Sequence, residues 1–285
     1  MSVAQKTVRE PAQFTGIGVN LGREVTLRIL PAPPNTGIIF RRTDLPNAPS
    51  IPVSPEYVCP MERRTMLQHG EAQVQMTEHL LAAASGLEID NLVVEVSGPE
   101  LPAGDGSARV FTDLLLTAGP LEQDTPRVLR TLAGPVTIAE GSSTITASPS
   151  TEGITVSYTL EYTGLAIAAQ RFEIHVTPES FAAELASART FVLQSEAAAL
   201  LSSGFGRGAS LENTLVLRQD GSLVYGDYRF PDELARHKAV DLLGDLRLVG
   251  TGIAARIDAV RTGHAHNFRL VQLLASKLIA IPAND

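Results

Sequence analysis

The chain has 285 residues, of which 44% are hydrophobic, so it is long enough for two ordinary domains with buried cores. Its 31 acidic residues outnumber its 23 basic residues and give a net charge of -8, which argues against nucleic acid as the main partner. Cys59 is the only cysteine, which excludes a disulfide framework and a thiolate zinc cluster.

The same cysteine count favours a reducing cytoplasm. The first ten residues lack the apolar core of a signal peptide, and no run of ~18 uncharged apolar residues occurs. We therefore expect a soluble, cytoplasmic protein without integral membrane association.

The first half of the chain is predicted to open on strands and to continue into helices. Residues 13–45 contain alternating apolar stretches separated by glycines, a pattern typical of antiparallel strands. From Thr77 the pattern changes to a helix that ends near Gly86, and residues 91–96 form the next strand. A loop rich in proline and glycine, residues 98–106, leads into a second helix.

Residues 120–135 contain three prolines and form the predicted domain boundary. We therefore divide the chain into a first domain of residues 1–125 and a second of residues 126–285. The second domain is predicted to open on strands again, over residues 136–147 and 154–160.

The main helix of the second domain is predicted over residues 231–246, where leucines and Val240 supply an apolar face. His237 and Asp241 are four residues apart, so an α-helix places them on one face, and Asp245 follows one turn later. An isolated His-x-x-x-Asp pair is common on solvated helices. The pair alone therefore does not indicate a metal site, and metal binding would require a third ligand from elsewhere in the chain.

The order of helix, strand, loop and helix occurs in both halves. In the second half a strand is predicted over residues 253–260, a loop over residues 261–264 and a helix over residues 267–278. The agreement indicates an internal repeat.

The alignment of His79 with His237 supports the repeat. It places Asp105 and His264, each in a glycine-containing loop, at nearly the same distance along the two copies. The predicted fold class is therefore α+β, with two domains of similar topology, each a sheet with helices, and an active site in the cleft between them.

Two similar domains packed face to face would bring His79 and His237 together. With Asp241 they form a His₂-carboxylate set, which leaves a coordination position open for water, as catalytic zinc sites require. These ligand types suit zinc or ferrous iron. A purely structural role for each histidine is the alternative.

Proton transfer requires further groups near such a site. Glu78, next to His79, is the candidate base. His264, predicted to lie in a flexible loop, is the candidate acid or oxyanion stabiliser, with Asp245 as the residue that orients it.

Six motifs in a fixed order make the chain resemble UDP-3-O-acyl-N-acetylglucosamine deacetylases, which catalyse the committed step of lipid A biosynthesis. The similarity runs from about residue 13 to residue 274. The motifs are Thr77-Glu-His-Leu-Leu, Gly86-Leu-Glu-Ile-Asp-Asn91, Asp105-Gly-Ser, Ala188-Arg-Thr-Phe191, Arg236-His-Lys-x-x-Asp-x-x-Gly-Asp-Leu246 and Gly263-His-Ala-His-Asn267. The resemblance implies two α+β domains with a Zn²⁺ site between them and a UDP-linked acylated amino sugar as substrate.

The resemblance also implies a role for each residue of the candidate set. The implied zinc ligands are His79, His237 and Asp241. The implied general base is Glu78, and the implied general acid is His264. These assignments agree with the roles reached from the residues alone.

Further residues receive roles from the resemblance alone. It implies that Thr190 lies near the developing oxyanion, that Phe191 borders the substrate and that Lys238 contacts it. Asp245 is implied to lie beside His264.

The chain also departs from the family pattern. Asn20 stands where the family usually has a histidine, and the usual His-Pro near Tyr162 is missing. Neither departure affects the metal set.

An apolar stretch after Thr190 is predicted to bind the acyl chain. Residues 191–201 carry apolar side chains, Leu200 among them, at helical spacing, and a glycine-rich loop follows. Because this segment begins beside the oxyanion candidate, we expect residues 190–208 to form the wall of an apolar passage. The alternative is an ordinary helix packed on its own core.

The sequence thus predicts a zinc-dependent amidohydrolase that releases acetate from UDP-3-O-acyl-N-acetylglucosamine. Two other classes stay open: a catalytically silent relative that binds acylated sugar nucleotides or a partner protein, and a His₂-carboxylate iron oxygenase. Retention of the full ligand and acid/base set argues against the silent relative.

Overall fold

The structure is a computed structural model that describes residues 3–61 and 64–281. Two five-stranded sheets share one pattern of pairing, which runs antiparallel, antiparallel, parallel, antiparallel from edge to edge. The first sheet consists, in spatial order, of β2 (Ala12–Ile17), β3 (Glu24–Pro31), β9 (Leu92–Val96), β4 (Ile38–Arg42) and β5 (Ser50–Pro52). The second consists of β12 (Val136–Glu140), β13 (Ser143–Pro149), β18 (Ala255–Val260), β14 (Ile154–Leu160) and β15 (Gln170–His175).

The helices complete the repeat. In the first half α1 (Glu78–Gly86) precedes the central strand β9 and α2 (Arg109–Ala118) follows it, and in the second half α5 (Glu233–Leu246) and α6 (His264–Lys277) flank β18 in the same way. The central strands bury alternate side chains, Val94 in β9 and Ile257 in β18, because one face of each sheet packs on helices. The predicted α+β fold class and the similar topology of the two halves are confirmed.

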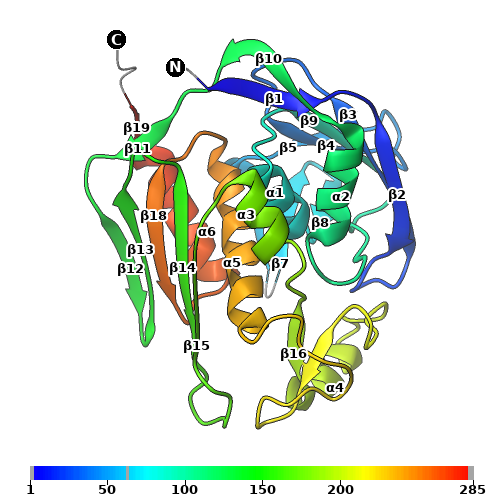
Figure 1. The fold of residues 1–285 in the computed structure, drawn as a ribbon. Coiled ribbons are helices and arrows are strands. Elements are labelled where there is room, and N and C mark those ends of the chain that lie inside the picture. The colour runs from blue at the N-terminus through cyan, green and yellow to red at the C-terminus, as the bar shows by residue number, and fades with distance from the viewer. Residues whose placement is uncertain (1–2, 62–63, 282–285) are drawn as a thin grey trace.

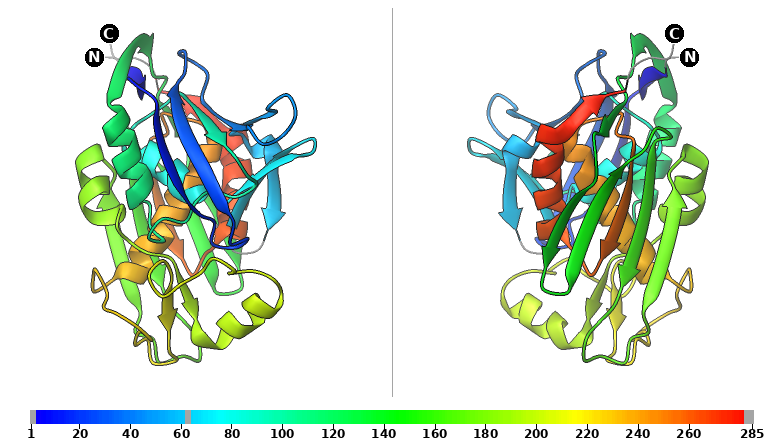
Figure 2. Two further views of the ribbon diagram at one scale, coloured as in Figure 1. Left: turned by 90° about the vertical axis from the view of Figure 1, so that its right-hand side faces the viewer. Right: turned by 90° about the vertical axis from the view of Figure 1, so that its left-hand side faces the viewer.

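The two sheets lie on the outside of the molecule, and helices α1, α5 and α6 lie between them (Figures 1 and 2). At the centre α1 packs against α5. The contact is close because Gly244 has no side chain: a Cβ atom there would lie 2.0 Å from the carbonyl oxygen of Glu78. The two equivalent helices therefore meet near the beginning of α1.

Smaller elements surround this framework. Short strands pair as β1 (Ala4–Val8) with β10 (Pro120–Pro126), β11 (Arg130–Leu132) with β19 (Leu278–Ala280), β16 (Phe191–Leu193) with β17 (Leu215–Leu217), and β6 (Val58–Met61) with β7 (Arg64–His69) and β8 (Ala72–Gln75). The remaining helical segments are η1 (Pro55–Tyr57), α3 (Pro178–Ser180), η2 (Phe181–Leu185), α4 (Gln194–Ser202) and η3 (Arg247–Val249). The division at residues 125 and 126 stays a prediction, and it falls at the end of β10.

Several predicted boundaries differ from the structure. Residues 136–147 form a hairpin, because Gly141 adopts a positive φ of 57° between β12 and β13. Residues 191–193 form a strand instead of the first turn of a helix, since this aromatic and β-branched segment pairs in parallel with β17.

Helix α6 begins at His264, three residues earlier than predicted, so the expected flexible loop around His264 is wrong. The carbonyl oxygen of Gly263 accepts hydrogen bonds from the N–H groups of His266 and Asn267, at 2.9 and 3.0 Å, which closes the first helical turn.

Within the described residues, the structure contains no helix with both the length and the apolar character needed to cross a membrane.

Candidate active site

Helices α1 and α5 bring three potential metal ligands together. His79 is the second residue of α1, and His237 and Asp241 lie one turn apart on α5. The Nε2 atoms of His79 and His237 lie 3.6 and 3.4 Å from Oδ1 of Asp241, and all three side chains are buried. One ligand atom from each residue lies within 4.8 Å of the others.

This spacing fits a metal ion. Donor atoms bound at ~2.0–2.2 Å in a tetrahedral site lie roughly 3.3–3.6 Å apart. Nδ1 of His237 lies 3.1 Å from the carbonyl oxygen of Ala188, so an N–H on Nδ1 donates there and leaves the Nε2 lone pair facing the other ligands. Burial lowers the pKa of His237 to about 3, which keeps the ring neutral, as a metal ligand must be.

The carboxylate of this group is held in its charged form. Burial alone would raise the pKa of Asp241, but the adjacent positive charge of Lys238 holds it well below its usual range. Nζ of Lys238 lies 2.9 Å from Oδ2 of Asp241, which leaves Oδ1 toward the two histidines. The three residues can therefore hold a divalent metal ion through two neutral nitrogens and one anionic oxygen.

Glu78 lies beside this group and is 2% exposed. Its Oε2 accepts a hydrogen bond of 3.3 Å from the backbone N–H of Thr65. Burial raises the pKa of Glu78, although the nearby His264 and His79 oppose the shift. A carboxylate with a raised pKa is a stronger proton acceptor than an ordinary glutamate at neutral pH.

His264 faces the same group from the start of α6. Its Nδ1 lies 2.7 Å from Oδ2 of Asp245, and its Nε2 lies 3.9 Å from Oδ2 of Asp241. Burial alone would lower the pKa of His264, but the charge and hydrogen bond of Asp245 raise it to about 9. The ring is therefore protonated at neutral pH and can donate a proton from Nε2.

Thr190 lines a small, mostly apolar pocket with His79. Gly106, Phe111 and Asn213 line the same pocket. The backbone N–H of Thr190 donates to the carbonyl oxygen of Gly106 at 2.7 Å, which fixes this position to the first half of the chain. A side chain at Gly106 would clash with the backbone of Asn213, since a Cβ atom would lie 1.8 Å from its carbonyl oxygen.

Phe191 and Lys238 lie on the second-half side of the site. The Phe191 ring packs edge-on against His237, with centroids 5.9 Å apart, and Nζ of Lys238 lies 5.5 Å from the Phe191 centroid. Phe191 is thus in contact with one of the potential metal ligands, and Lys238 lies next to Phe191.

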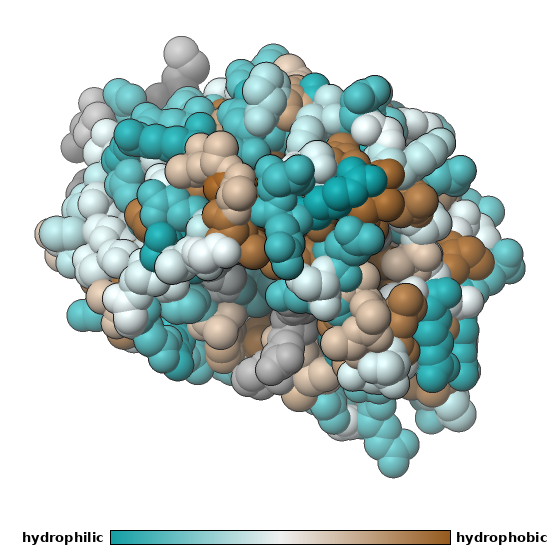
Figure 3. All heavy atoms as spheres, turned by 90° about the horizontal axis from the view of Figure 1, so that it is seen from below, coloured by the Kyte–Doolittle hydropathy of each residue, from teal (hydrophilic) through white to brown (hydrophobic). Residues whose placement is uncertain are grey.

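Leu200 lies on α4, which together with β16 projects at the bottom of Figure 1. No residue of α4 is buried, and Leu201 is 57% exposed. Figure 3 shows apolar side chains among polar ones on the face seen from this side. The exposure of α4 argues against the alternative of an ordinary core helix.

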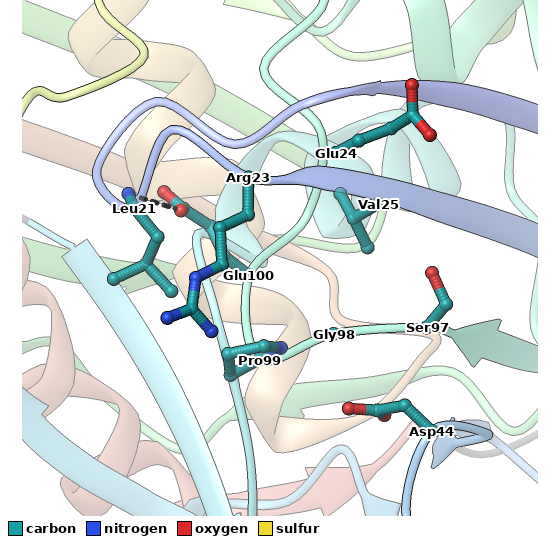
Figure 4. Close-up of a pocket in the computed structure, with 9 residues that line it drawn as sticks. All are labelled: Leu21, Arg23, Glu24, Val25, Asp44, Ser97, Gly98, Pro99 and Glu100. Carbon is teal, nitrogen blue, oxygen red and sulfur yellow. Dashed lines mark hydrogen bonds between the residues drawn. The ribbon is translucent and has the colours of Figure 1, made fainter.

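A second hollow lies next to the loop that contains Asn20 (Figure 4). Glu100, 2% exposed, accepts hydrogen bonds from the N–H groups of Asn20 and Leu21, at 2.7 and 2.8 Å. The carbonyl oxygens of Val19 and Asn20 in turn accept hydrogen bonds from the loop after α4. Hydrogen bonds to backbone groups thus fix this loop, and none of them involves the side chain of Asn20.

Sequence reasoning missed Glu100, Thr65 and the role of Asn267. Asn267 ends one of the quoted motifs, and its Nδ2 donates to Oδ2 of Asp245 at 2.9 Å. Glu100 follows a Gly-Pro pair that resembles any surface turn. The position of Asn267 at the end of a motif and near the start of a helix could have indicated its role. The roles of Glu100 and Thr65 depend on contacts between distant segments and could not be predicted from local sequence.

The comparison with known proteins agrees with this geometry. A protein-family model described as UDP-3-O-acyl N-acetylglycosamine deacetylase matches residues 5–276. The chain belongs to this family. The UDP-3-O-acyl-N-acetylglucosamine deacetylase of Myxococcus xanthus (strain DK1622) is 38% identical over 275 residues, which cover 96% of this chain and 87% of that protein. The protein of the same name from Chlamydia felis (strain Fe/C-56) is 39% identical over 276 residues, 96% and 98% of the two chains.

A third deacetylase, from Phenylobacterium zucineum (strain HLK1), is 38% identical over 275 residues, 96% of this chain and 94% of its own. The resemblance predicted from the six motifs is therefore confirmed. The matched range of residues 5–276 extends over both halves and includes the positions of the candidate metal group and of its acid/base neighbours.

Proposed function

We propose that this deacetylase-family member hydrolyses the acetamide of UDP-3-O-acyl-N-acetylglucosamine and releases acetate, a step of lipid A biosynthesis. The observation that carries the proposal is the meeting of His79, His237 and Asp241 next to Glu78 and His264 at the α1–α5 contact. The names of the relatives supply the substrate class. We further propose a cytoplasmic enzyme, on the basis of the single cysteine.

The donor set favours zinc as the metal, with His79, His237 and Asp241 as its ligands. A bound zinc ion lowers the pKa of water toward ~7 and polarises a carbonyl group. Two imidazoles and one carboxylate without a thiolate match the ligand types of catalytic zinc sites.

Two residues of the chain carry out the two proton transfers in this proposal: Glu78 accepts a proton and His264 donates one. Glu78 in its ionised form takes a proton from the attacking water, whose oxygen forms a bond to the acetamide carbon. His264 in its protonated form gives a proton to the nitrogen as the C–N bond breaks, which leaves a free amine and acetate. Asp245 keeps the His264 ring in position through Nδ1.

Three more residues act on the substrate in this proposal. The Thr190 hydroxyl stabilises the negative charge that develops on the carbonyl oxygen, because it lines the pocket next to His79. Phe191 borders the sugar, and Lys238 contributes positive charge for the substrate while it is paired with Asp241.

Acetate release by purified protein tests the proposal. The expected result is one acetate and one free amine for each UDP-3-O-acyl-N-acetylglucosamine consumed, without a requirement for oxygen. Binding of the UDP-sugar without acetate release would instead identify a silent relative. Turnover that depends on oxygen would identify an iron oxygenase.

We expect a bell-shaped dependence of kcat/KM on pH. On the basic side the rate should fall as the pH rises through about 9, because His264 loses the proton that the leaving amine needs. On the acidic side the rate should fall at a pH above the usual glutamate pKa, because burial raises the pKa of Glu78 and its protonated form cannot accept a proton.

The matching experiment compares pH-rate profiles of the wild type and His264→Gln. The variant should lose rate and also lose the basic limb, since His264 no longer titrates. An unchanged basic limb in the variant would show that another group produces it. A flat wild-type profile between about pH 5 and 9 would reject paired acid and base catalysis.

For the acyl chain we propose a passage whose wall spans residues 190–208, with Leu200 on its apolar side. Leu200→Glu should lower kcat/KM for long-acyl substrates at least ~10-fold, because the loss of contact with two methylenes at ~0.8 kcal/mol each already corresponds to that factor. Short-acyl substrates should be affected far less.

Leu116→Glu is a suitable control, because Leu116 is a 48% exposed leucine on α2. It should leave the ratio of long-acyl to short-acyl activity unchanged, and both variants should retain their metal. Equal losses for both acyl lengths in Leu200→Glu would place the passage elsewhere.

A further inference from the structure

We propose that Thr65 is a positioning residue that ties the proton acceptor of the reaction to the group that orients the proton donor. The inference rests on the roles proposed above for Glu78 and His264. It adds a residue outside the motifs that identified the site.

Thr65 contacts both sides of the site. It lies on β7 and is 4% exposed. Its backbone N–H donates to Oε2 of Glu78 at 3.3 Å, and its hydroxyl donates a hydrogen bond to Oδ1 of Asp245. The same hydroxyl oxygen lies 3.3 Å from Nδ1 of His264. One residue of the first half therefore contacts the base of its own half and the Asp245–His264 pair of the other.

The hydroxyl completes the environment of the Asp245 carboxylate. Oδ2 of Asp245 accepts hydrogen bonds from His264 and Asn267, at 2.7 and 2.9 Å, whereas Oδ1 accepts the one from Thr65. Asp245 is 1% exposed, so water does not readily replace a missing donor. Without the Thr65 hydroxyl the carboxylate can rotate, and the imidazole held on Oδ2 rotates with it.

The backbone of Thr65 is itself anchored close to Glu78. Its carbonyl oxygen accepts a hydrogen bond of 3.0 Å from the N–H of Met76, two residues before Glu78. Met76 has a φ of 61°, in the left-handed region that a methionine rarely adopts. This hydrogen bond helps to hold the turn that leads from β8 into α1. Thr65 thus has a fixed position from which its hydroxyl reaches across to the second half.

The test compares Thr65→Val, which removes the hydroxyl and keeps the shape, with Thr65→Ser, which keeps the hydroxyl. Thr65→Val should lower kcat on the order of 10- to 100-fold, which is part of the ~10²- to 10⁴-fold that a well-positioned proton donor contributes, with KM changed little. Thr65→Ser should recover most of kcat. Metal content, measured independently of activity, should stay at the wild-type level in both variants.

Thr7→Val is the matched control. Thr7 is also a 4% exposed strand residue, and its hydroxyl donates to the carbonyl oxygen of Asn91 at 2.7 Å and accepts from the N–H of Ala32 at 3.0 Å, so these partners are not residues of the site. It should lower the urea midpoint about as much as Thr65→Val does while kcat stays at the wild-type value. If Thr65→Val does not fold, Thr65→Ala serves in its place.

A double-mutant cycle shows whether Thr65 acts through Asp245. In the Asp245→Asn background, Thr65→Val should cost little further kcat, because the carboxylate oxygen that it positions is already changed. Independent, multiplicative losses would overturn the proposal, as would equal kcat in Thr65→Val and Thr7→Val or a failure of serine to restore kcat. A wild-type protein that releases no acetate would instead reject the proposed function and this inference with it.

Discussion

Glu78→Gln is expected to lower kcat by about 10²- to 10⁴-fold while the protein keeps its metal. Glutamine has nearly the same shape and can still accept the Thr65 N–H through its amide oxygen, so the packing at the α1–α5 contact should survive. It cannot take a proton from water at neutral pH. KM should change little, because the substitution removes a proton acceptor and not a binding contact.

Metal analysis of the same preparation separates the two roles open to a carboxylate beside His79. Wild-type metal content with strongly reduced turnover supports Glu78 as the base. A loss of metal that parallels the loss of turnover would make Glu78 a ligand. Turnover near the wild-type rate would assign the proton transfer to another group.

His237→Ala is expected to remove both metal and activity. His237 is 2% exposed, and its Nε2 is one of the three donors that face one another. The loss of metal affinity should exceed the ~10- to 100-fold that follows from removing an outer hydrogen-bond partner of a ligand, because a donor itself is lost. Activity should fall in proportion to the metal that remains bound.

His175→Ala provides a matched control for the loss of an imidazole. His175 is an exposed residue of β15 whose Nδ1 lies 3.2 Å from the Thr155 hydroxyl. This variant should retain wild-type metal content and turnover. Full metal occupancy in His237→Ala would contradict the proposed ligand set.

The duplicated fold could be predicted because both halves show the same order of local helix, strand and loop patterns in the sequence. The helix from Glu78 to Gly86 begins one residue after the predicted start, and the equivalent strands β9 and β18 differ from their predicted ranges by one or two residues. Helical spacing alone placed His237 and Asp241 on one face. Sequence could not show how closely α1 approaches α5, which depends on the absence of a side chain at Gly244.

Other features depend on contacts between distant segments. Residues 191–193 form a strand only because residues 215–217 pair with them. His264 was predicted to lie in a loop, but it is the first residue of α6. The first turn of this helix is closed by backbone hydrogen bonds to Gly263, and no capping side chain in the sequence indicates this start. Sequence patterns also did not indicate a role for Thr65, because its partner Asp245 lies in the other half of the chain.

The most direct measurement is acetate release from UDP-3-O-acyl-N-acetylglucosamine by protein stripped of metal with a chelator and then titrated with zinc. Two neutral imidazoles and one carboxylate should bind zinc without a thiolate, so activity should vanish on stripping and return as about one zinc per chain is restored. Full acetate release by the metal-free protein, or no recovery at full zinc occupancy, would contradict this account of the site.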